Sequence, residues 1–278
     1  AKITKIPQYE AQLIDTPSIF MPQLSWLDAE QEAHFPPTDQ SLAYPPGLLA
    51  AGGALTPNWL LTAYERGIFP WYSEGEPILW WSPEPRMVFI PGTMHLSRSL
   101  RKAYRQSPPT ITTNTVFPRV IKACQAPRAR QPGTWISAKM RKAYTELHTQ
   151  GWAHSIEVWR NDDLIGGLYG IGIEGVFFGE SMFSRQPNAS KFALLALQEA
   201  SLLQSLRLID CQVYNDHLAS LGAREVERTW FEQQLPVLRR KLTFPNADAV
   251  NQAIARRVKV GGSGYSPDPS IREPVNET

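Results

Sequence analysis

The sequence predicts an α+β protein in which a small N-terminal domain precedes a larger domain built on a mixed β-sheet flanked by helices. Three apolar segments with strand-like alternation follow one another, joined by short turns: 154–159, 164–171 and 175–183. A helical pattern over 189–203 and a fourth strand-like segment over 206–214 come next. Before residue 86, proline and tryptophan are frequent and periodicity is weak, which is typical of loops between short elements.

The N-terminal region contains one clear helix. Residues 1–45 are expected to form an irregular arm, because they contain a proline-rich stretch with little periodicity. Thr56 is a good N-cap, Pro57 suits the first helical position, and Gly67 suits the C-terminal cap. A loop dense in proline and tryptophan follows this helix. We place a domain boundary at its end, so that 1–85 forms the arm and the small domain.

The larger domain is expected to span 86–246, with several helices around its sheet. Helical patterns cover three stretches before the strands and one after them: 97–106, 115–124, 137–150 and 229–241. Asn188 is expected to cap the helix over 189–203. The weak patterning after residue 246 predicts a weakly structured tail over 247–278. This order of strands and helices is similar to that of acetyltransferase-type acyltransferases, an analogy that does not fix function.

The composition excludes several classes of protein. The chain of 278 residues has a net charge of +2, so RNA binding would depend on a local basic patch. Its two cysteines, Cys124 and Cys211, lie far apart, and its five histidines lack zinc-binding spacing, so we expect no metal and no cofactor. No apolar run approaches the roughly 20 residues that span a bilayer, and the first residues lack a signal-peptide core. We therefore expect a cytoplasmic protein without membrane contact, and we take a monomer as the default.

The segment 206–214 carries polar side chains in an apolar setting. Alternation places Asp210 and Gln212 on one face. A buried carboxylate needs a partner, so Asp210 is either a structural residue held by the backbone or an arginine, or part of a site. The polar residues 215–217 at the strand's end keep both interpretations open. Glu180, which lies among aromatic residues, either receives an ammonium group or forms a salt bridge within the sheet.

A basic stripe and several loop tryptophans indicate an RNA partner. Four basic residues share one face of the helix predicted over 97–106: Arg98, Arg101, Lys102 and Arg105. Such spacing usually indicates a solvated helix face. No acidic residue occurs from 87 to 145, although the chain has 26, which adds weight to a phosphate-binding surface and favours an RNA backbone as partner. We expect one or two loop tryptophans to stack a nucleobase and the others to anchor the core: Trp71, Trp80, Trp81 and Trp135.

Seven blocks of sequence, in family order between residues 47 and 234, resemble the leucyl/phenylalanyl-tRNA–protein transferases. The blocks read GLLAAGGALTPNWLLTAYERGIFPWYSEGEPILWWSPEPR, GTWIS, HSIEVW, GGLYG, FGESMFS, NASK and LIDCQVYNDHLASLGA. The resemblance implies a bacterial cytoplasmic enzyme with a small N-terminal domain and an acetyltransferase-like C-terminal domain. It also implies transfer of Leu or Phe, less well Met, from aminoacyl-tRNA to proteins beginning with Arg or Lys, which marks them for degradation by the N-end rule pathway.

The same resemblance implies roles for individual residues. Asp210 and Gln212 match the catalytic pair, and Trp71 and Trp135 resemble the tryptophans that hold the 3′-terminal adenosine. Glu180 matches the acidic residue of the pocket, and Ser184 and Asn215 are assigned with it to substrate binding. The pocket for the donor side chain is matched by Leu168, Met182, Leu197 and Ile209. The family pocket can carry Met and Phe where this chain has Leu168 and Leu197, which affects the preference between Leu and Phe.

The chemistry of the reaction needs positioning more than a strong base. The pKa of an α-amine is about 8, so a useful fraction of the amine is neutral at cytoplasmic pH. We expect Gln212 to hydrogen-bond the attacking amine and Asp210 to orient or polarise Gln212. No serine or cysteine has the arrangement of an activated nucleophile, so direct transfer is expected.

The sequence is also compatible with two other functions. An acyltransferase that uses acyl-CoA usually has a glycine-rich loop before the long helix, and here that loop reads SRQPNASK. An RNA-binding module without activity would explain the basic stripe and the tryptophans, but it would leave Asp210, Gln212 and Glu180 without a purpose.

Overall fold

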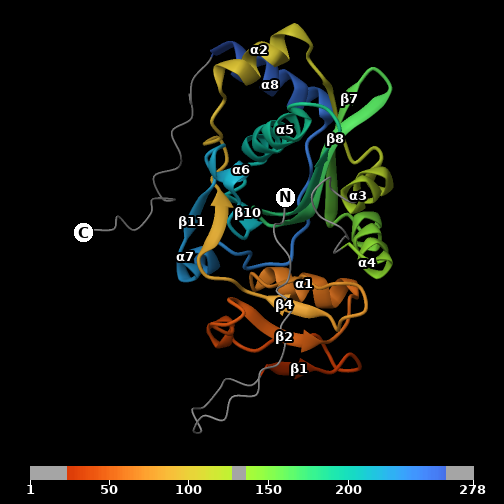
Figure 1. Ribbon diagram of the computed structural model, residues 1–278, viewed down its shortest axis with the longest axis vertical. Helices are drawn as coiled ribbons and strands as arrows, with labels where there is room; N and C mark the ends of the chain where they lie inside the picture. The colour runs from red at the N-terminus through yellow and green to blue at the C-terminus, as the bar shows by residue number, and fades with distance from the viewer. Residues whose placement is uncertain (1–23, 127–135, 261–278) are drawn as a thin grey trace, which may run out of the picture.

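The computed structural model describes residues 24–126 and 136–260, which form two β-sheets with helices around them (Figure 1). The smaller sheet, red to orange at the bottom of Figure 1, has the strand order β1-β2-β4-β3. Strands β1 and β2 are parallel, and the other pairs are antiparallel. The bounds are β1 Ser25–Leu27, β2 Leu48–Gly52, β3 Phe69–Pro70 and β4 Leu79–Trp81.

The larger sheet has seven strands in the order β11-β5-β10-β9-β8-β7-β6. Only β9 and β10 run parallel among the strand pairs described here, which makes the sheet mixed, as predicted. The bounds are β5 Arg86–Phe89, β6 Thr110–Thr113, β7 Ala153–Arg160, β8 Asp163–Ile173, β9 Val176–Ser184, β10 Leu208–Gln212 and β11 Arg224–Val226. The predicted α+β class, with a small N-terminal unit and a larger C-terminal one, is confirmed.

Helices cover both faces of the larger sheet. Helices α2, α5 and α8 lie on one face, where their apolar residues form one core cluster. Helices α3 and α4 lie on the other face and share a second cluster with α1 and the smaller sheet. The bounds are η1 Thr38–Gln40, α1 Pro57–Glu65, α2 Arg98–Gln106, α3 Phe117–Gln125, α4 Ala138–Thr149, α5 Ala189–Leu203, α6 Asp216–Ala219, α7 Arg228–Gln233 and α8 Ala247–Val260.

Local sequence signals explain where several of these elements begin and end. Three helices start at a side-chain oxygen that accepts a backbone hydrogen bond at 3.1–3.4 Å: Thr56 for α1, Ser97 for α2 and Ser137 for α4. Gly67 follows α1 with a φ of 70°, a conformation that favours glycine. Strand β8 is buried at every position after Asp163, because helices cover both of its faces. No helix in the described part of the chain is long and apolar enough to cross a membrane.

Two helix predictions are wrong in detail. Asn188 precedes α5 with a φ of 66°, and its side chain makes no capping hydrogen bond. The N–H of Ser190 instead bonds Oγ of Ser184 at 3.3 Å. The helix predicted over 229–241 ends at Gln233. Pro236 follows shortly afterwards and cannot continue a helix, because it lacks an N–H and clashes with the preceding turn.

The prediction of a weakly structured tail is wrong for Ala247–Val260, which forms helix α8. One face of this helix is buried against α5, with side chains at helical spacing: Val250, Ala253, Ile254 and Val258. Oδ1 of Asn246 accepts the N–H of Ala249 at 2.9 Å and so caps the first turn. Residues 261–278 of the predicted tail lie outside the described residues.

Candidate active site

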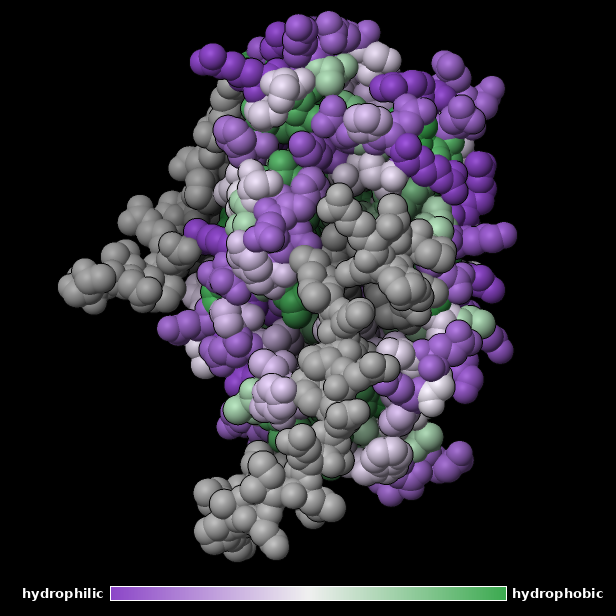
Figure 2. Space-filling model, in the orientation of Figure 1, coloured by the Kyte–Doolittle hydropathy of each residue, from purple (hydrophilic) through white to green (hydrophobic). Residues whose placement is uncertain are grey.

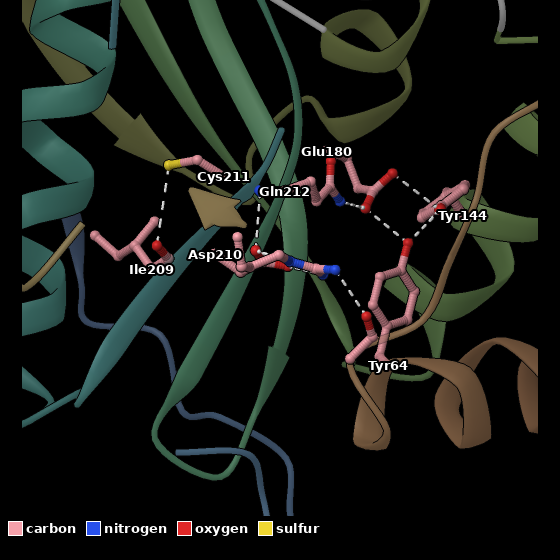
Figure 3. A network of polar contacts seen from close by, with 9 residues as sticks. Tyr64, Tyr144, Glu180, Ile209, Asp210, Cys211 and Gln212 are labelled. Carbon is pink, nitrogen blue, oxygen red and sulfur yellow. Dashed lines mark hydrogen bonds and ion pairs between the residues drawn. The ribbon is translucent and has the colours of Figure 1, made fainter. Parts of the chain in front are cut away.

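Strand β9 carries a β-bulge at Glu180. Against β8, Ser181 pairs with Tyr169 and Gly179 pairs with Gly170, so Glu180 is the extra residue. A bulge interrupts the alternation of side chains and redirects one of them. The Glu180 side chain is buried and lies near the tyrosines of α1 and α4 (Figure 3).

A second bulge interrupts the neighbouring strand β10. Asp210 pairs with Val88 of β5 and Gln212 pairs with Met87, so Cys211 is the extra residue. Gln212 has a φ of 67°, which is uncommon for a residue other than glycine. The strand ends there, short of the predicted residue 214. The two bulges bring Gln212 to Glu180, with Nε2 of Gln212 donating to Oε1 of Glu180 at 2.9 Å.

Three donors converge on the buried carboxylate of Glu180. Tyr64 donates to Oε1 at 2.7 Å and Tyr144 donates to Oε2 at 3.0 Å, in addition to the amide of Gln212. The two phenol oxygens also contact each other. Burial, with the Glu180 charge beside them, raises the pKa of both tyrosines well above the usual value. The phenols therefore keep their protons and act as donors at neutral pH.

Asp210 lies in a buried ion pair with Arg86. Nε and Nη2 of Arg86 donate to the two carboxylate oxygens at 2.8 and 2.7 Å, and the side chains are 1% and 0% exposed. Oδ1 of Asp210 also accepts the backbone N–H of Gln212 at 2.9 Å. The hydrogen bonds of the carboxylate thus go to Arg86 and to the backbone of Gln212, not to the Gln212 amide. This geometry supports a positioning role for Asp210, which is also among the residues that line the cavity beside Gln212.

Three buried oxygens at this site lack a hydrogen-bond partner among the described residues: the hydroxyl oxygens of Tyr169 and Ser181 and the amide oxygen of Gln212. The amide nitrogen of Gln212 donates to Glu180, and the amide oxygen, Oε1, is buried and receives no donor from residues 24–126 or 136–260. Leaving a buried amide oxygen unpaired is costly, and such an atom calls for an explanation. A bound N–H group would satisfy it.

An apolar cavity of about 50 Å³ lies beside Gln212, between the sheet and α5. A water needs roughly 15 Å³ by this measure, so the cavity has room for a larger apolar group. Glu180 and Gln212 are among its polar lining residues. The apolar lining unites the four residues expected to contact the donor side chain with two others: Leu168, Met182, Leu197, Ile209, Leu194 and Leu218.

Three other residues expected to bind substrate, all within the described part of the chain, do not line this cavity: Trp71, Ser184 and Asn215. Trp71 packs against Trp81, with ring centroids 5.6 Å apart. The side-chain oxygens of Ser184 and Asn215 accept backbone N–H groups at the starts of α5 and α6. Trp135 lies outside the described residues.

The predicted basic stripe forms part of α2. Arg98, Lys102 and Arg105 are exposed and Arg101 is half-buried. Arg105 also donates to the carbonyl of Val258 at 3.1 Å, which ties it to α8. Figure 2 shows hydrophilic side chains over the top of the molecule, where α2 and α8 lie.

A second basic surface lies between α3 and α4. It is a groove of about 670 Å³ whose charged lining residues are Lys122, Arg141, Lys142 and Glu146. The opposite face of α4 places Tyr144 against Glu180. The groove and the polar site are therefore separated by about the width of one helix, roughly 10 Å.

Sequence reasoning missed three residues of the polar site: Tyr64, Tyr144 and Arg86. A buried tyrosine in a helix looks like any other aromatic core residue, and an arginine beside a proline-rich loop carries no motif of its own. The need of a buried Asp210 for a cationic partner was the one available signal, but it could not select Arg86 among 28 cationic residues.

The nearest thiol is poorly suited to covalent catalysis. Burial, and next the Asp210 charge, raise the pKa of Cys211, which keeps the thiol protonated and weakly nucleophilic at neutral pH. Among the described residues, no group of three or more His, Cys, Asp or Glu side chains is placed to hold a metal ion.

Comparison with known proteins finds two matching family models. The leucyl/phenylalanyl-tRNA protein transferase model matches residues 88–236, and the model of the N-terminal domain of that family matches residues 53–84. Curated relatives named leucyl/phenylalanyl-tRNA–protein transferase include one from Chromohalobacter salexigens and one from Shewanella baltica. The one from Chromohalobacter salexigens is 55% identical over 208 residues, 75% of this chain and 81% of the relative. The one from Shewanella baltica is 51% identical over 234 residues, 84% of this chain and 98% of the relative.

Among solved structures, L-PGS from Bacillus licheniformis is similar with a TM-score of 0.33 and 11% sequence identity, over 69% of this chain and 66% of that one. This similarity is too low to define the fold by itself.

Proposed function

The chain belongs to the leucyl/phenylalanyl-tRNA–protein transferase family and is thus an aminoacyltransferase that uses aminoacyl-tRNA, and we propose that it transfers Leu or Phe, less readily Met, to proteins beginning with Arg or Lys. The new N-terminal residue would mark the acceptor for degradation by the N-end rule pathway. Because charged tRNA and that pathway are cytoplasmic, we place the enzyme there, acting as a monomer.

The apolar cavity supports the choice of donor. Its wall of leucines, Met182 and Ile209 suits an uncharged side chain, whereas a charged one would lose its hydration without gaining a partner. An apolar pocket distinguishes substrates by only about 1–3 kcal/mol per methylene, so several apolar aminoacyl groups are accepted. The ester of the charged tRNA would then lie beside Gln212, at the polar end of the cavity.

The observation that carries this proposal is the amide oxygen of Gln212, for which the described residues supply no donor. The acceptor amine donates one N–H to Oε1, which directs its lone pair at the carbonyl carbon of the ester. The new C–N bond forms, the bond from that carbon to the ribose oxygen breaks, and the proton given up by the amine neutralises the ribose oxygen. Alignment of this kind supplies much of the acceleration in acyl transfer.

Glu180 contributes charge at the place where the acceptor arrives. Its buried carboxylate, fixed by three donors, attracts the α-ammonium group before that group loses a proton. About a tenth of α-amines are already neutral one pH unit below their pKa of roughly 8, so a dedicated strong base is unnecessary. Asp210 contributes indirectly, through the backbone of Gln212.

Two basic surfaces are available for the tRNA backbone. The stripe on α2, formed by Arg98, Arg101, Lys102 and Arg105, is the one expected from sequence. The groove between α3 and α4 is the other, and it lies one helix width from Glu180. Trp71 and Trp135 are proposed to hold the terminal adenosine between the backbone contacts and the ester.

One assay tests the proposed function. Labelled Leu-tRNA is mixed with peptides that are identical except for an N-terminal Lys, Arg or Ala, and label is expected on the first two only. The variant Gln212→Met keeps the length of the side chain but removes Oε1, and it is expected to lose roughly 10- to 100-fold in kcat. The matched variant Gln204→Met lies at the end of α5 and should behave as wild type.

Other outcomes would point elsewhere. Label on all three peptides contradicts the proposed acceptor rule but keeps the aminoacyl transfer. No transfer from charged tRNA, together with transfer from an acyl-CoA, refutes the proposal in favour of a different acyl donor. Binding of tRNA without transfer to any peptide would favour an RNA-binding module.

A further inference from the structure

The C-terminal end of helix α1 belongs to the N-terminal unit but contacts two parts of the polar site. One part is Glu180, and the other is the ion pair of Arg86 with Asp210. Tyr64, in the last turn of α1, donates to Glu180 at 2.7 Å. Its ring also packs against Phe178 of β9, with centroids 5.2 Å apart. Both Tyr64 and Glu180 are buried, so the hydrogen bond is shielded from water and its length is fixed by packing.

A second contact from the same end of α1 reaches the ion pair of Arg86 with Asp210. Nη1 of Arg86 donates to the carbonyl of Gly67 at 2.9 Å, while Nε and Nη2 bind Asp210. The guanidinium lies between two aromatic rings, 4.9 Å from the centroid of Phe69 and 4.4 Å from that of Phe231. These hydrogen bonds and ring contacts fix the position of Arg86, which connects the chain after α1 with strand β10.

Position 67 leaves no room for another residue. Gly67 has a φ of 70°, and a Cβ built there would lie 2.6 Å from the ring of Phe231. A side chain would therefore displace the ring that covers Arg86. The close approach of backbone and ring fixes the Gly67 carbonyl where Arg86 can bind it.

The two contacts meet at Gln212. From Tyr64 the path runs through Glu180 to the amide nitrogen of Gln212. From Gly67 it runs through Arg86 and Asp210 to the backbone N–H of Gln212. Gln212 adopts a left-handed backbone conformation that costs roughly 1–2 kcal/mol for a residue with a side chain, so it needs external contacts to hold it.

We propose that the segment from Tyr64 to Gly67 is a positioning element for the reaction, and that Tyr64 and Arg86 are positioning residues that set the direction of the Gln212 amide oxygen. The N-terminal unit then contributes to the geometry of the polar site as well as to the surface of the protein. This inference rests on the proposed function, because it concerns the residue to which that function assigns the amine.

The alternative is that these contacts only stabilise the fold. The chain contains a second arginine, Arg257, that serves as a matched control for Arg86. Arg257 pairs with Glu199 at 2.6 Å and donates to the carbonyls of Gly92 and Met94, both at 2.9 Å. This second arginine has the same kinds of partner as Arg86, but Glu199, Gly92 and Met94 do not line the cavity. Its replacement reports the cost to stability alone.

The test compares conservative variants by kcat, KM and unfolding temperature. Tyr64→Phe keeps the ring and removes the hydroxyl, and Arg86→Lys keeps the charge and removes the planar fork. Both are expected to lower kcat roughly 10- to 100-fold, the effect of losing a hydrogen bond to a charged group, with KM for charged tRNA changed less than about twofold. Arg257→Lys should keep the wild-type kcat, as should Tyr104→Phe, whose ring packs against Phe192.

The outcomes separate this proposal from the proposed function. If wild-type protein transfers the aminoacyl group and folded Tyr64→Phe does so at the same rate, the positioning role is refuted while the transferase activity stands. The same conclusion follows if Arg86→Lys loses no more activity than Arg257→Lys. Should Arg86→Lys fail to fold, Tyr64→Phe decides the matter alone. A wild-type protein that transfers nothing would refute the proposed function itself.

Discussion

Replacing Asp210 by asparagine tests how much this carboxylate contributes to stability and how much it contributes to the rate of transfer. The substitution keeps the size of the side chain and removes its charge. Arg86, 1% exposed, would then hold a buried positive charge opposite an amide whose N–H groups repel its own. Removing one partner of a buried ion pair typically costs about 3–5 kcal/mol, and we expect Asp210→Asn to lie in that range.

The expected change in melting temperature follows from this cost. A domain of roughly 150–250 residues loses about 2–4 °C for each kcal/mol, so Asp210→Asn should melt on the order of 10 °C below wild type. Calorimetry measures the shift, and kcat is measured well below both transitions so that unfolding does not contribute.

A double variant completes this experiment. Asp210→Leu with Arg86→Met removes both charges, and replacing a buried pair by apolar residues is often neutral or stabilising, so most of the lost stability should return. Transfer should stay slow, because the backbone N–H of Gln212 has lost its acceptor. An Asp210→Asn protein that melts within about 2 °C of wild type would contradict the energetic reasoning. A double variant with wild-type kcat would contradict the positioning role.

Three further predictions concern other parts of the molecule. Leu197→Ala enlarges the apolar cavity, so the ratio of Phe to Leu transfer should rise roughly 10-fold or more, and an unchanged ratio in a donor competition assay would remove Leu197 from the donor pocket. Burial lowers the pKa of His154 from 6.5 to about 4, so below pH 6.5 the unfolded chain binds a proton that the folded chain does not. As the pH falls from 6.5 to about 4, His154 should therefore lower the free energy of unfolding by roughly 1.4 kcal/mol per pH unit. In urea titrations, His154→Gln should show a weaker dependence of this free energy on pH than wild type. An equal dependence would exclude His154 as the cause. The pair Arg98→Glu and Arg101→Glu should raise the KM for charged tRNA and weaken its dependence on salt, whereas an unchanged KM would make the stripe an ordinary solvated surface.

Elements with strong local signals were predictable. Helix α1 has a threonine N-cap, a proline at the first position and a glycine after its end, and each signal acts within one turn. The consecutive strands β7, β8 and β9 pair with their neighbours in the chain, so their alternation and short turns suffice. The family blocks identified the chemistry for a similar reason, because each is a contiguous stretch.

Elements stabilised by distant partners were not predictable in the same way. Strand β5 has only four residues, and its register comes from β10 and β11, more than a hundred residues away. Helix α8 showed a weak pattern, and it is stable because α5 covers its apolar face. Strict alternation would also carry β10 to residue 214, but a bulge and the left-handed Gln212 end the strand earlier.

The sequence by itself determined the local elements, the family and three polar residues at the centre of the site, Asp210, Gln212 and Glu180, because motifs and periodicity depend on neighbours in the chain. Only the tertiary structure decided what each polar atom does. Arg86 binds the carboxylate of Asp210, Glu180 accepts from the amide nitrogen of Gln212, and the amide oxygen has no partner in the part of the chain that the structure describes. These assignments depend on contacts between residues up to 124 positions apart in the chain, and hydrogen bonding and burial at such distances exist only once the chain has folded.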